Sequence, residues 1–467
     1  MLDKPLQDDI QKAYRSFLAA RSLKPRYAQK HMIAAVARQI GGIKSDESGT
    51  RLGEDQVVAV EAGTGTGNTI AYLMAALPIA KAKGKSLIVS TATVALQEQL
   101  INKDLPELAE HAGLEFNYEI AKGRRRYLCV SRLEGLLSHQ NDLTQTAFFE
   151  DEVSQVLGPD QIQVYSGMMD EFASGRWKGD RDELEVEFDD ETWLPLTSDH
   201  MQCTNRRCAH FNACPFYRAR SDIENADILI VNHDLVLADL ALGGGAILPE
   251  PESSIYIFDE AHHLGDKATN HFSLSMRVQG SEKSLKTLER QLKGLLDESG
   301  SALVLQDPIE RIQNGLRVVQ AHLARLDDVV SDAFLPLAVD EKRLRYPSGV
   351  IPQSLQTLCL ELAQFIAQID PQLEKIINAL KEAMEDDQSP IDRGVGEKWL
   401  PPLSTQFGRI QRMMWLCRSF SQPDEKNKVP TARWLVRFEN ENGRDIELHS
   451  APVSAESHMR ELLWDAC

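Results

Sequence analysis

Residues 58–69 read Val-Ala-Val-Glu-Ala-Gly-Thr-Gly-Thr-Gly-Asn-Thr, and this stretch decides the fold. The β-branched residues predict a strand that enters a glycine-rich turn, and a helix is expected to open at Thr69. Glycines let backbone N–H groups surround a phosphate, and the helix N-terminus adds a partial positive charge. The stretch therefore indicates a nucleotide-binding loop made of Ala62, Gly63, Thr64, Gly65, Thr66, Gly67, Asn68 and Thr69.

This loop departs from the pattern G-x-x-x-x-G-K-[ST] at two positions. Ala62 stands in place of the first glycine, and Asn68 stands in place of the lysine that reaches the β- and γ-phosphates. Thr69 keeps the hydroxyl that the pattern offers to Mg²⁺. Because Asn68 is shorter than lysine and neutral, a tight strand-to-helix connection without a ligand is the alternative interpretation.

A second motif favours the nucleotide site. Residues 254–262 read Ser-Ile-Tyr-Ile-Phe-Asp-Glu-Ala-His, an apolar strand that ends in two carboxylates. Asp259 can hold Mg²⁺, and Glu260 can orient and deprotonate an attacking water, with His262 completing the candidate catalytic set. Upstream of the loop, Gln29 lies where an adenine-reading glutamine would lie, although alone it reads equally as a surface helix residue. An apolar strand into this motif after a phosphate loop rarely arises by chance.

The surrounding pattern alternates helices and strands with short connections, which predicts a parallel sheet covered on both faces. Residues 267–430 are expected to be largely helical, since leucines and isoleucines recur at a spacing of three to four around 285–296 and 373–380. The predicted helices are 7–20, 27–41, 69–82, 93–102 and 454–464, and the predicted strands after the first are 86–91, 228–231, 255–259, 434–438 and 446–448.

Four cysteines form a third group of candidate site residues. Cys203, Cys208 and Cys214 follow one another closely, and Cys129 lies in an arginine-rich segment. Four thiolates suit a [4Fe–4S] cluster or Zn²⁺. Structural zinc sites usually contain C-x₂₋₄-C pairs, and no C-x₂-C occurs here, so the spacing favours iron–sulfur. Unconnected buried thiols are the remaining alternative.

Basic residues gather in the same part of the chain, with Tyr127, Phe211, Phe216 and Tyr217 among them. Cationic side chains for phosphates and aromatic faces for bases are typical of a groove for single-stranded nucleic acid. A solvated charged face is the alternative interpretation. The candidate DNA contacts are Arg124, Arg125, Arg126, Arg206 and Arg207.

The composition sets limits on the function. With 467 residues and 42% apolar content the chain should hold at least two domains, and its net charge of −19 argues against a general nucleic-acid binder. The start of the sequence is polar and acidic, which does not resemble a signal peptide, and the longest apolar run, 70–80, is too short to span a membrane. Seven cysteines without a secretory signal indicate the reducing cytosol, so we expect a cytoplasmic protein.

Together these residues resemble the DinG branch of the iron–sulfur superfamily 2 helicases, relatives of XPD. The motifs that carry the resemblance are Gln29, the loop 62–69, residues 90–97, the four cysteines, residues 231–233 and residues 259–263.

The resemblance implies an α/β fold, a RecA-like parallel-sheet motor domain interrupted by an iron–sulfur insertion and by a helical arch. It implies motor segments at 1–123, 223–266 and 431–467, an iron–sulfur domain at 124–222 and an arch at 267–430. It also implies a [4Fe–4S] cluster, ATP with Mg²⁺, and ATP-driven 5′→3′ unwinding of DNA with a 5′ single-stranded tail, D-loops and R-loops. The expected partners are single-stranded and 5′-tailed DNA and DNA–RNA hybrids, and the protein is expected to be a monomer without membrane contact.

Two departures bear on activity. Asn68 replaces the family lysine, and the sequence given ends before the expected second motor domain, so residues 1–467 are expected to be inactive alone. Two other readings remain: a non-catalytic iron–sulfur module that binds single-stranded DNA, and a zinc-bearing nucleotide-binding protein without a helicase role.

Overall fold

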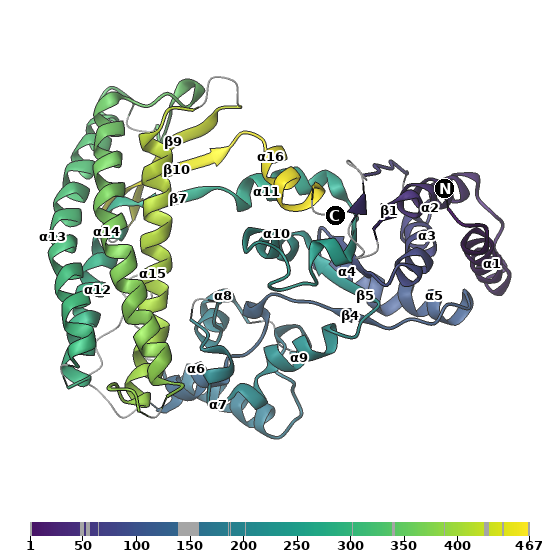
Figure 1. Cartoon of the computed structure of the whole chain (residues 1–467), viewed down its shortest axis with the longest axis horizontal. Helices are drawn as coiled ribbons and strands as arrows, with labels where there is room; N and C mark the ends of the chain where they lie inside the picture. The colour runs from purple at the N-terminus through teal and green to yellow at the C-terminus, as the bar shows by residue number, and fades with distance from the viewer. Residues whose placement is uncertain are drawn as a thin grey trace. The chain divides into compact units, whose positions relative to one another are not determined.

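A parallel β-sheet of four strands is the centre of the first of two compact units in the computed structural model (Figure 1). The strand order is β4-β5-β3-β6, and every neighbouring pair is parallel. Unit 1 comprises Met1–Gly123, Arg218–His271 and Ser454–Cys467, and unit 2 comprises Arg124–Tyr217 and Phe272–Val453. The strands are β3 (Ser86–Thr91), β4 (Tyr118–Ile120), β5 (Ile228–Asn232) and β6 (Ser254–Phe258). The predicted α/β class with a parallel sheet is confirmed.

The structure describes residues 2–46, 51–52, 57–63, 65–138, 158–184, 186, 188–200, 202–300, 302–338, 341–386, 388–424, 429–440 and 443–465. Within these ranges, no helix combines the length and the apolar character that crossing a membrane requires.

The apolar run 70–80 lies in α3 (Asn68–Ala82), the central helix of unit 1. Leu73, Met74 and Ala76 of this helix are completely buried, because α1, α2 and the sheet pack around it. A helix that is apolar all round is expected to be buried in this way. The other elements of unit 1 are α1 (Lys4–Ala20), α2 (Tyr27–Gly42), β1 (Lys44–Ser45), β2 (Arg51–Leu52), α4 (Val94–Gln99), α5 (Leu105–His111), α10 (His233–Ala241), α11 (Leu264–His271) and α16 (Glu456–Met459), with π-helical turns at Leu100–Asp104 and Arg460–Trp464.

One predicted strand is absent from the structure. Residues 57–63 have no regular secondary structure, and Val57, Val58 and Val60 are each more than a third exposed. β-Branched residues favour an extended backbone, but a strand also needs a neighbour to bond with, and the sheet of unit 1 ends at β6. The predicted strands 86–91, 228–231 and 255–259 correspond to β3, β5 and β6.

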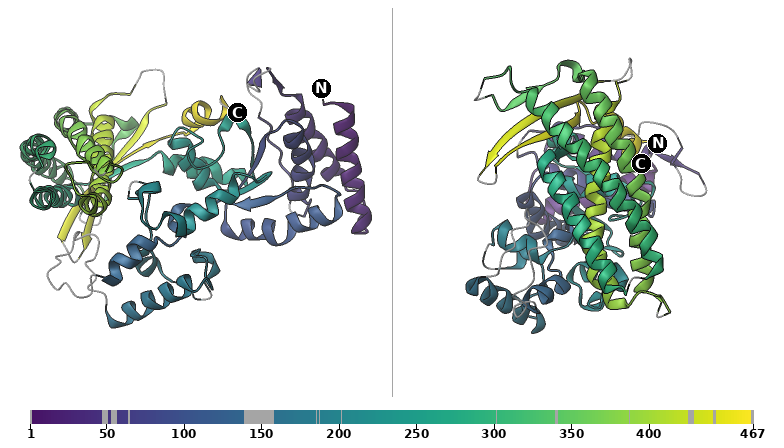
Figure 2. Two further views of the ribbon diagram at one scale, coloured as in Figure 1. Left: turned by 60° about the horizontal axis from the view of Figure 1, so that its bottom comes forward. Right: turned by 90° about the vertical axis from the view of Figure 1, so that its left-hand side faces the viewer.

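Four long helices dominate unit 2 and pack side by side (Figures 1 and 2). The predicted apolar stripes form their shared core, since Leu288, Leu292, Leu373 and Ile376 are completely buried. The helices are α12 (Val278–Glu298), α13 (Leu303–Asp332), α14 (Gln353–Ala383) and α15 (Arg393–Ser421).

An antiparallel sheet in the order β7-β10-β9-β8 packs against these helices. The strands predicted at 434–438 and 446–448 lie in it and are longer than expected. The four strands are β7 (Leu274–Arg277), β8 (Arg343–Arg345), β9 (Thr431–Asn440) and β10 (Gly443–Pro452).

The cysteine-bearing segment of unit 2 has a small apolar core of its own. Tyr165, Trp193 and Leu196 are completely buried there. The indole of Trp193 donates a hydrogen bond to the carbonyl of Arg125 at 2.8 Å, which fixes the arginine-rich segment onto this core. The helices are α6 (Val130–Ser138), α7 (Pro159–Ala173), α8 (Asp190–Trp193) and α9 (Pro215–Ile223), the last of which extends into unit 1.

Candidate functional site

The glycine-rich loop makes a tight turn before α3. Gly65 and Gly67 have φ angles of 76° and 78°, a left-handed conformation that glycine adopts without a steric penalty. The hydroxyl of Thr66 donates to the carbonyl of Gly63 at 2.6 Å, which closes the turn. The helix begins at Asn68, with Gly67 as its N-cap. Thr64 lies outside the described residues, so its predicted role stays a prediction.

Two residues of α2 and the turn before it support this loop. Gln29 donates to the carbonyl of Gly67 at 3.2 Å and accepts from the hydroxyl of Tyr14 at 2.9 Å, and Arg26 donates to the carbonyl of Gly65. A Cβ on Gly67 would lie 2.7 Å from the Gln29 amide nitrogen, so only glycine fits. Gln29 is buried, which excludes the surface-residue interpretation. Its adenine-reading role stays a prediction, and its contacts here are with the loop.

Asn68 and Ala62 occupy the two positions that depart from the phosphate-loop pattern. The side-chain oxygen of Asn68 is buried and has no hydrogen-bond partner in the described part of the chain. Ala62 packs against the core of unit 1. A lysine at 68 would bring a full charge to this place, whereas Asn68 brings an unpaired acceptor and an amide donor.

The end of β6 places the two carboxylates at the same edge of the sheet. The hydroxyl of Tyr72 in α3 lies 3.3 Å from Oδ2 of Asp259, and the Asp259 amide donates to the Ser90 carbonyl at 2.8 Å. Glu260 follows in a left-handed conformation with a φ of 54°, which is uncommon for a residue other than glycine. Its carboxylate lies 3.3 Å from Nδ1 of His262. The loop helix and the carboxylate motif are therefore brought together.

A third carboxylate, which no sequence motif marks, joins this group. Burial raises the pKa of Asp104, and it also raises the pKa of Asp259, with the charges of Glu260 and Asp104 acting in the same direction on Asp259. The Thr69 side chain interacts with both Tyr72 and Asp104. Two neighbouring carboxylates with raised pKa values, Asp104 and Asp259, are typical of a place where a cation is needed.

His233 lies beneath the same edge. Its ring is completely buried, and its Nδ1 is 2.7 Å from the hydroxyl of Ser90. Burial lowers the pKa of His233 to about 4. The segments 90–97 and 231–233, which carry the family resemblance, thus meet through one buried hydrogen bond.

In unit 2, Cys129, Cys203, Cys208 and Cys214 line one small cavity. Burial raises the pKa of both Cys208 and Cys214, and the charges of Cys129 and Cys203 raise them further, so the four thiols interact electrostatically. Backbone N–H groups point at these sulfurs: those of Phe216 and Tyr217 toward Cys214, and that of Asn205 toward Cys203 at 3.3 Å.

The arrangement of donors bears on which inorganic group would fit. In the described residues no three His, Cys, Asp or Glu side chains converge closely enough to hold a single metal ion. Four thiols around one small cavity, with N–H groups directed at sulfur, are donors of the type that a [4Fe–4S] cluster takes, and the cluster itself stays a prediction.

Most of the predicted DNA-binding arginines have protein partners. Arg124 stacks on Phe216 with 4.0 Å to the ring centroid, Arg125 lies 3.4 Å from Asp199, and Arg126 pairs with Asp182. Arg207 pairs with Glu385 of the region after α14. Arg206 is exposed and has no ion pair in the described ranges, so it is the member of the set that is open to a ligand.

Residues 194–280 match the family model DEAD_2. The chain is 31% identical to the ATP-dependent DNA helicase DinG of Photobacterium profundum, over 99% of this chain and 64% of that protein. It is 30% identical to the ATP-dependent DNA helicases DinG of Salmonella paratyphi A and Escherichia coli (strain K12), over 94% of this chain and 59% of each relative. The chain therefore spans about three fifths of the length of the curated relatives it matches. Over the residues that it spans, the chain is similar to DinG-type helicases.

Proposed function

We propose that this chain is the part of an ATP-dependent DNA helicase that binds ATP and DNA. The observation that carries the proposal is the contact between Tyr72 of the loop helix and Asp259 at the end of β6, which unites the phosphate loop with the carboxylate motif. The relatives that bear the name of DNA helicase support the same assignment.

The residues of unit 1 have distinct roles in this proposal. The N–H groups at the start of α3 bind the phosphates, supported by the loop 62–69 and by the Gln29 contact with Gly67. Asp259 and the Thr69 hydroxyl hold Mg²⁺, which neutralises phosphate charge when bound. Glu260 orients the attacking water and accepts its proton, and His262 holds the Glu260 carboxylate.

In unit 2, the four cysteines hold a [4Fe–4S] cluster that fastens the segment 124–222. This segment has only a small apolar core, so four covalent bonds to one cluster would add much of its rigidity. Arg206 contacts the DNA backbone from this segment.

The proposed substrates follow from the family. They are DNA with a 5′ single-stranded tail, D-loops and R-loops, unwound in the 5′→3′ direction by a cytoplasmic monomer. The segment 267–430 is the proposed arch, and residues 1–123, 223–266 and 454–467 are the proposed motor segments. Residues 431–453, first expected in the motor, pair with strands of unit 2 and are assigned with the arch.

A second candidate rests on Asn68. Its buried side-chain oxygen lacks a partner among the described residues, and the position lacks the cation that binds the β- and γ-phosphates in the pattern. A non-catalytic iron–sulfur module that binds single-stranded DNA would tolerate this residue.

Calorimetry of ATP binding, together with steady-state phosphate release with and without 5′-tailed DNA, separates the two candidates. ATP binding that strengthens after Asn68→Lys, or DNA-stimulated release that Glu260→Gln abolishes, supports the helicase. DNA binding without any ATP binding, in the wild type and after Asn68→Lys alike, supports the non-catalytic module.

A further inference from the structure

The antiparallel sheet of unit 2 has a second face that does not pack on the helices. Leu435 and Leu448 belong to the core shared with the helices. Because successive residues of a strand point to opposite faces, Trp434 and His449 lie on the other face. The register places Arg345 opposite Trp434 and Trp434 opposite His449. This second face, which we call the outer face, therefore carries aromatic and cationic side chains from neighbouring strands.

An aromatic pair lies at the centre of the outer face. The rings of Trp434 and His449 are parallel within 4°, with centroids 4.9 Å apart. Beside them, the guanidinium of Arg277 lies 5.0 Å from the ring centroid of Phe438. These side chains are only partly buried, except that Arg277 is exposed. Flat aromatic groups on the open face of a sheet are the surface on which unpaired bases stack in many nucleic-acid-binding domains.

Three arginines, Arg277, Arg343 and Arg345, lie on the outer face although the whole chain carries −19. Arg343 and Arg345 are exposed, line an open groove with Val436, and have no ion-pair partner in the part of the chain that is described. Two acidic residues of the strand β10 lie on this face, and both are already engaged. Oε2 of Glu447 lies 3.3 Å from Nε2 of His449 and 4.0 Å from Arg277. Asp445, opposite Phe438, accepts from the backbone N–H groups of Gln279 and Gly280 at 3.0 and 3.1 Å. A further acidic residue, Glu341, also lines the groove. Two arginines two positions apart on one strand suit consecutive phosphates.

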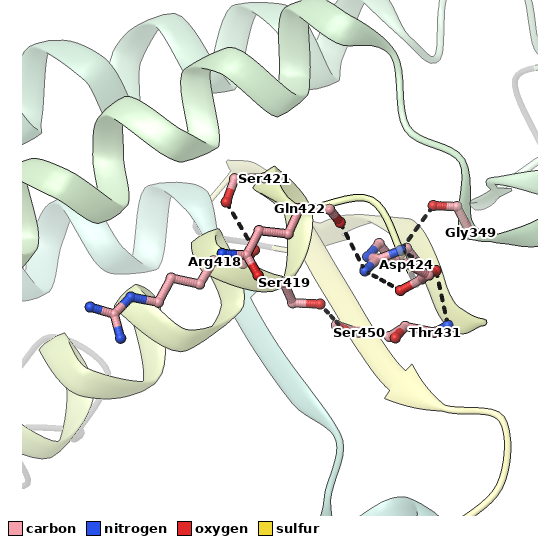
Figure 3. Close-up of polar contacts among 9 residues, drawn as sticks. Gly349, Arg418, Ser419, Ser421, Gln422, Asp424, Thr431 and Ser450 are labelled. Atoms are coloured by element: carbon pink, nitrogen blue, oxygen red, sulfur yellow. Dashed lines mark hydrogen bonds and ion pairs between the residues drawn. The ribbon is translucent and has the colours of Figure 1, made fainter. Parts of the chain in front are cut away.

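The sheet is held rigidly from its inner face, as Figure 3 shows for Asp424, Thr431 and the pair Ser419 and Ser450. Both carboxylate oxygens of Asp424 accept from Arg433 at 2.9 Å, and the Arg433 side chain is almost completely buried. A surface fixed in this way loses little conformational freedom when a ligand binds.

We infer that the outer face of this sheet binds single-stranded DNA, with a base stacked on the Trp434 and His449 pair and phosphates held by Arg343 and Arg345. The choice of DNA as the ligand rests on the proposed function. The inferred surface contains none of the arginines assigned to DNA binding above.

The test measures binding of the whole chain to a fluorescently labelled dT20 strand by anisotropy. Trp434→Leu should weaken binding by about 5- to 150-fold, the loss expected for one stacked base. The matched control is Trp415→Leu, since Trp415 is a more exposed tryptophan on α15 of the same unit, and it should bind like the wild type.

A second experiment tests the phosphate contacts by comparing two double variants that have equal net charge. Arg343→Gln with Arg345→Gln should lower the slope of log affinity against log salt by about 1.4, because two phosphate contacts on a single strand are lost. Arg311→Gln with Arg317→Gln, at exposed positions of α13, should leave the slope unchanged. Circular dichroism melts establish that every variant is folded.

The outcomes separate this inference from the proposed function. Absence of dT20 binding by the wild type would overturn both. Unchanged dT20 binding by folded Trp434→Leu and by the double variant of Arg343 and Arg345 would overturn the inference alone. If these variants lose binding to an rU20 strand but keep binding to dT20, the outer face binds RNA and the assigned partner is wrong.

Discussion

His233 makes the stability of unit 1 depend on pH. Its ring is completely buried, and burial together with the charge of Lys267 lowers its pKa from 6.5 to about 4. The Glu260 carbonyl and the Asp234 carboxylate oppose this lowering only in part. The folded protein therefore holds His233 neutral at pH values where the unfolded chain already binds a proton.

The sign and the magnitude follow from that difference. Above pH 6.5 the buried neutral His233 costs unit 1 little stability. As the pH falls toward 4, the free energy of unfolding decreases, because the unfolded state takes up the proton first. With pKa values of 6.5 unfolded and about 4 folded, the cost is about 0.2 kcal/mol at pH 7 and about 2 kcal/mol at pH 5. The free energy of unfolding of unit 1 should thus fall by about 2 kcal/mol between these pH values through this one residue.

The measurement compares the wild type with His233→Gln. Proteins are equilibrated in urea at pH 7 and pH 5, pulsed briefly with deuterium at one common pH, and analysed by mass spectrometry of peptides from β3 and β5. The difference between the two proteins is the informative quantity, because the raised pKa values of Asp104 and Asp259 make those groups titrate in the opposite direction. His31→Gln, at an exposed position of α2, is the control.

The wild type is expected to be more stable than His233→Gln at pH 7, and this advantage should shrink by about 2 kcal/mol at pH 5. An advantage that stays constant within about 0.5 kcal/mol would refute the reasoning, since it would mean that His233 accepts a proton as readily in the folded protein as in the unfolded chain.

Three further predictions concern the sites. Anaerobically purified protein should contain about four iron and four sulfide per chain, and Cys208→Ser should bleach it and loosen residues 124–222; stoichiometric zinc without iron would contradict the cluster. Arg206→Glu should weaken single-stranded DNA binding and its salt dependence, measured by anisotropy, whereas Arg126→Glu should chiefly destabilise the fold, because Arg126 is paired with Asp182. Asn68→Lys should increase ATP affinity in calorimetry, with little gain in phosphate release; release of a few ATP per second by the unaltered chain, sensitive to Glu260→Gln, would show that the effect of Asn68, expected to be about 10²–10³ in rate, is misjudged.

Local patterns explain which elements the sequence could predict. The helical stripe of Leu288 and Leu292 follows the helical period, and the strand 86–91 contains a run of leucine, isoleucine and valine; both elements were found where expected. The segment 57–63 has equally strong β-branched character but no hydrogen-bonded neighbour in the described sheet. Strand formation depends on a partner that lies far away in sequence, so composition alone was misleading there.

The candidate site also depends on contacts between residues that lie far apart in the sequence. Asp259 and Glu260 are visible as a motif, but Tyr72 lies 187 positions from Asp259, and Ser90 lies 143 positions from His233. Asp104 follows no motif at all and enters the site through the π-helical turn after α4. Such contacts are set by the packing of helices onto the sheet, and no local pattern encodes them.

The arginines of the cysteine-bearing segment show a similar gap, because their clustering predicts a binding function but does not reveal their contacts. Five arginines in one segment indicate a polyanion, but the sequence does not reveal which of them already have partners. Arg124 lies on Phe216 beside the cysteine cavity, and Arg125, Arg126 and Arg207 face carboxylates. Reversing the charge of a paired arginine leaves its carboxylate partner uncompensated, so the resulting loss of DNA binding would report on folding as much as on contact. Arg206 and the outer-face pair Arg343 and Arg345 lack such partners among the described residues, and their substitution therefore tests DNA contact directly.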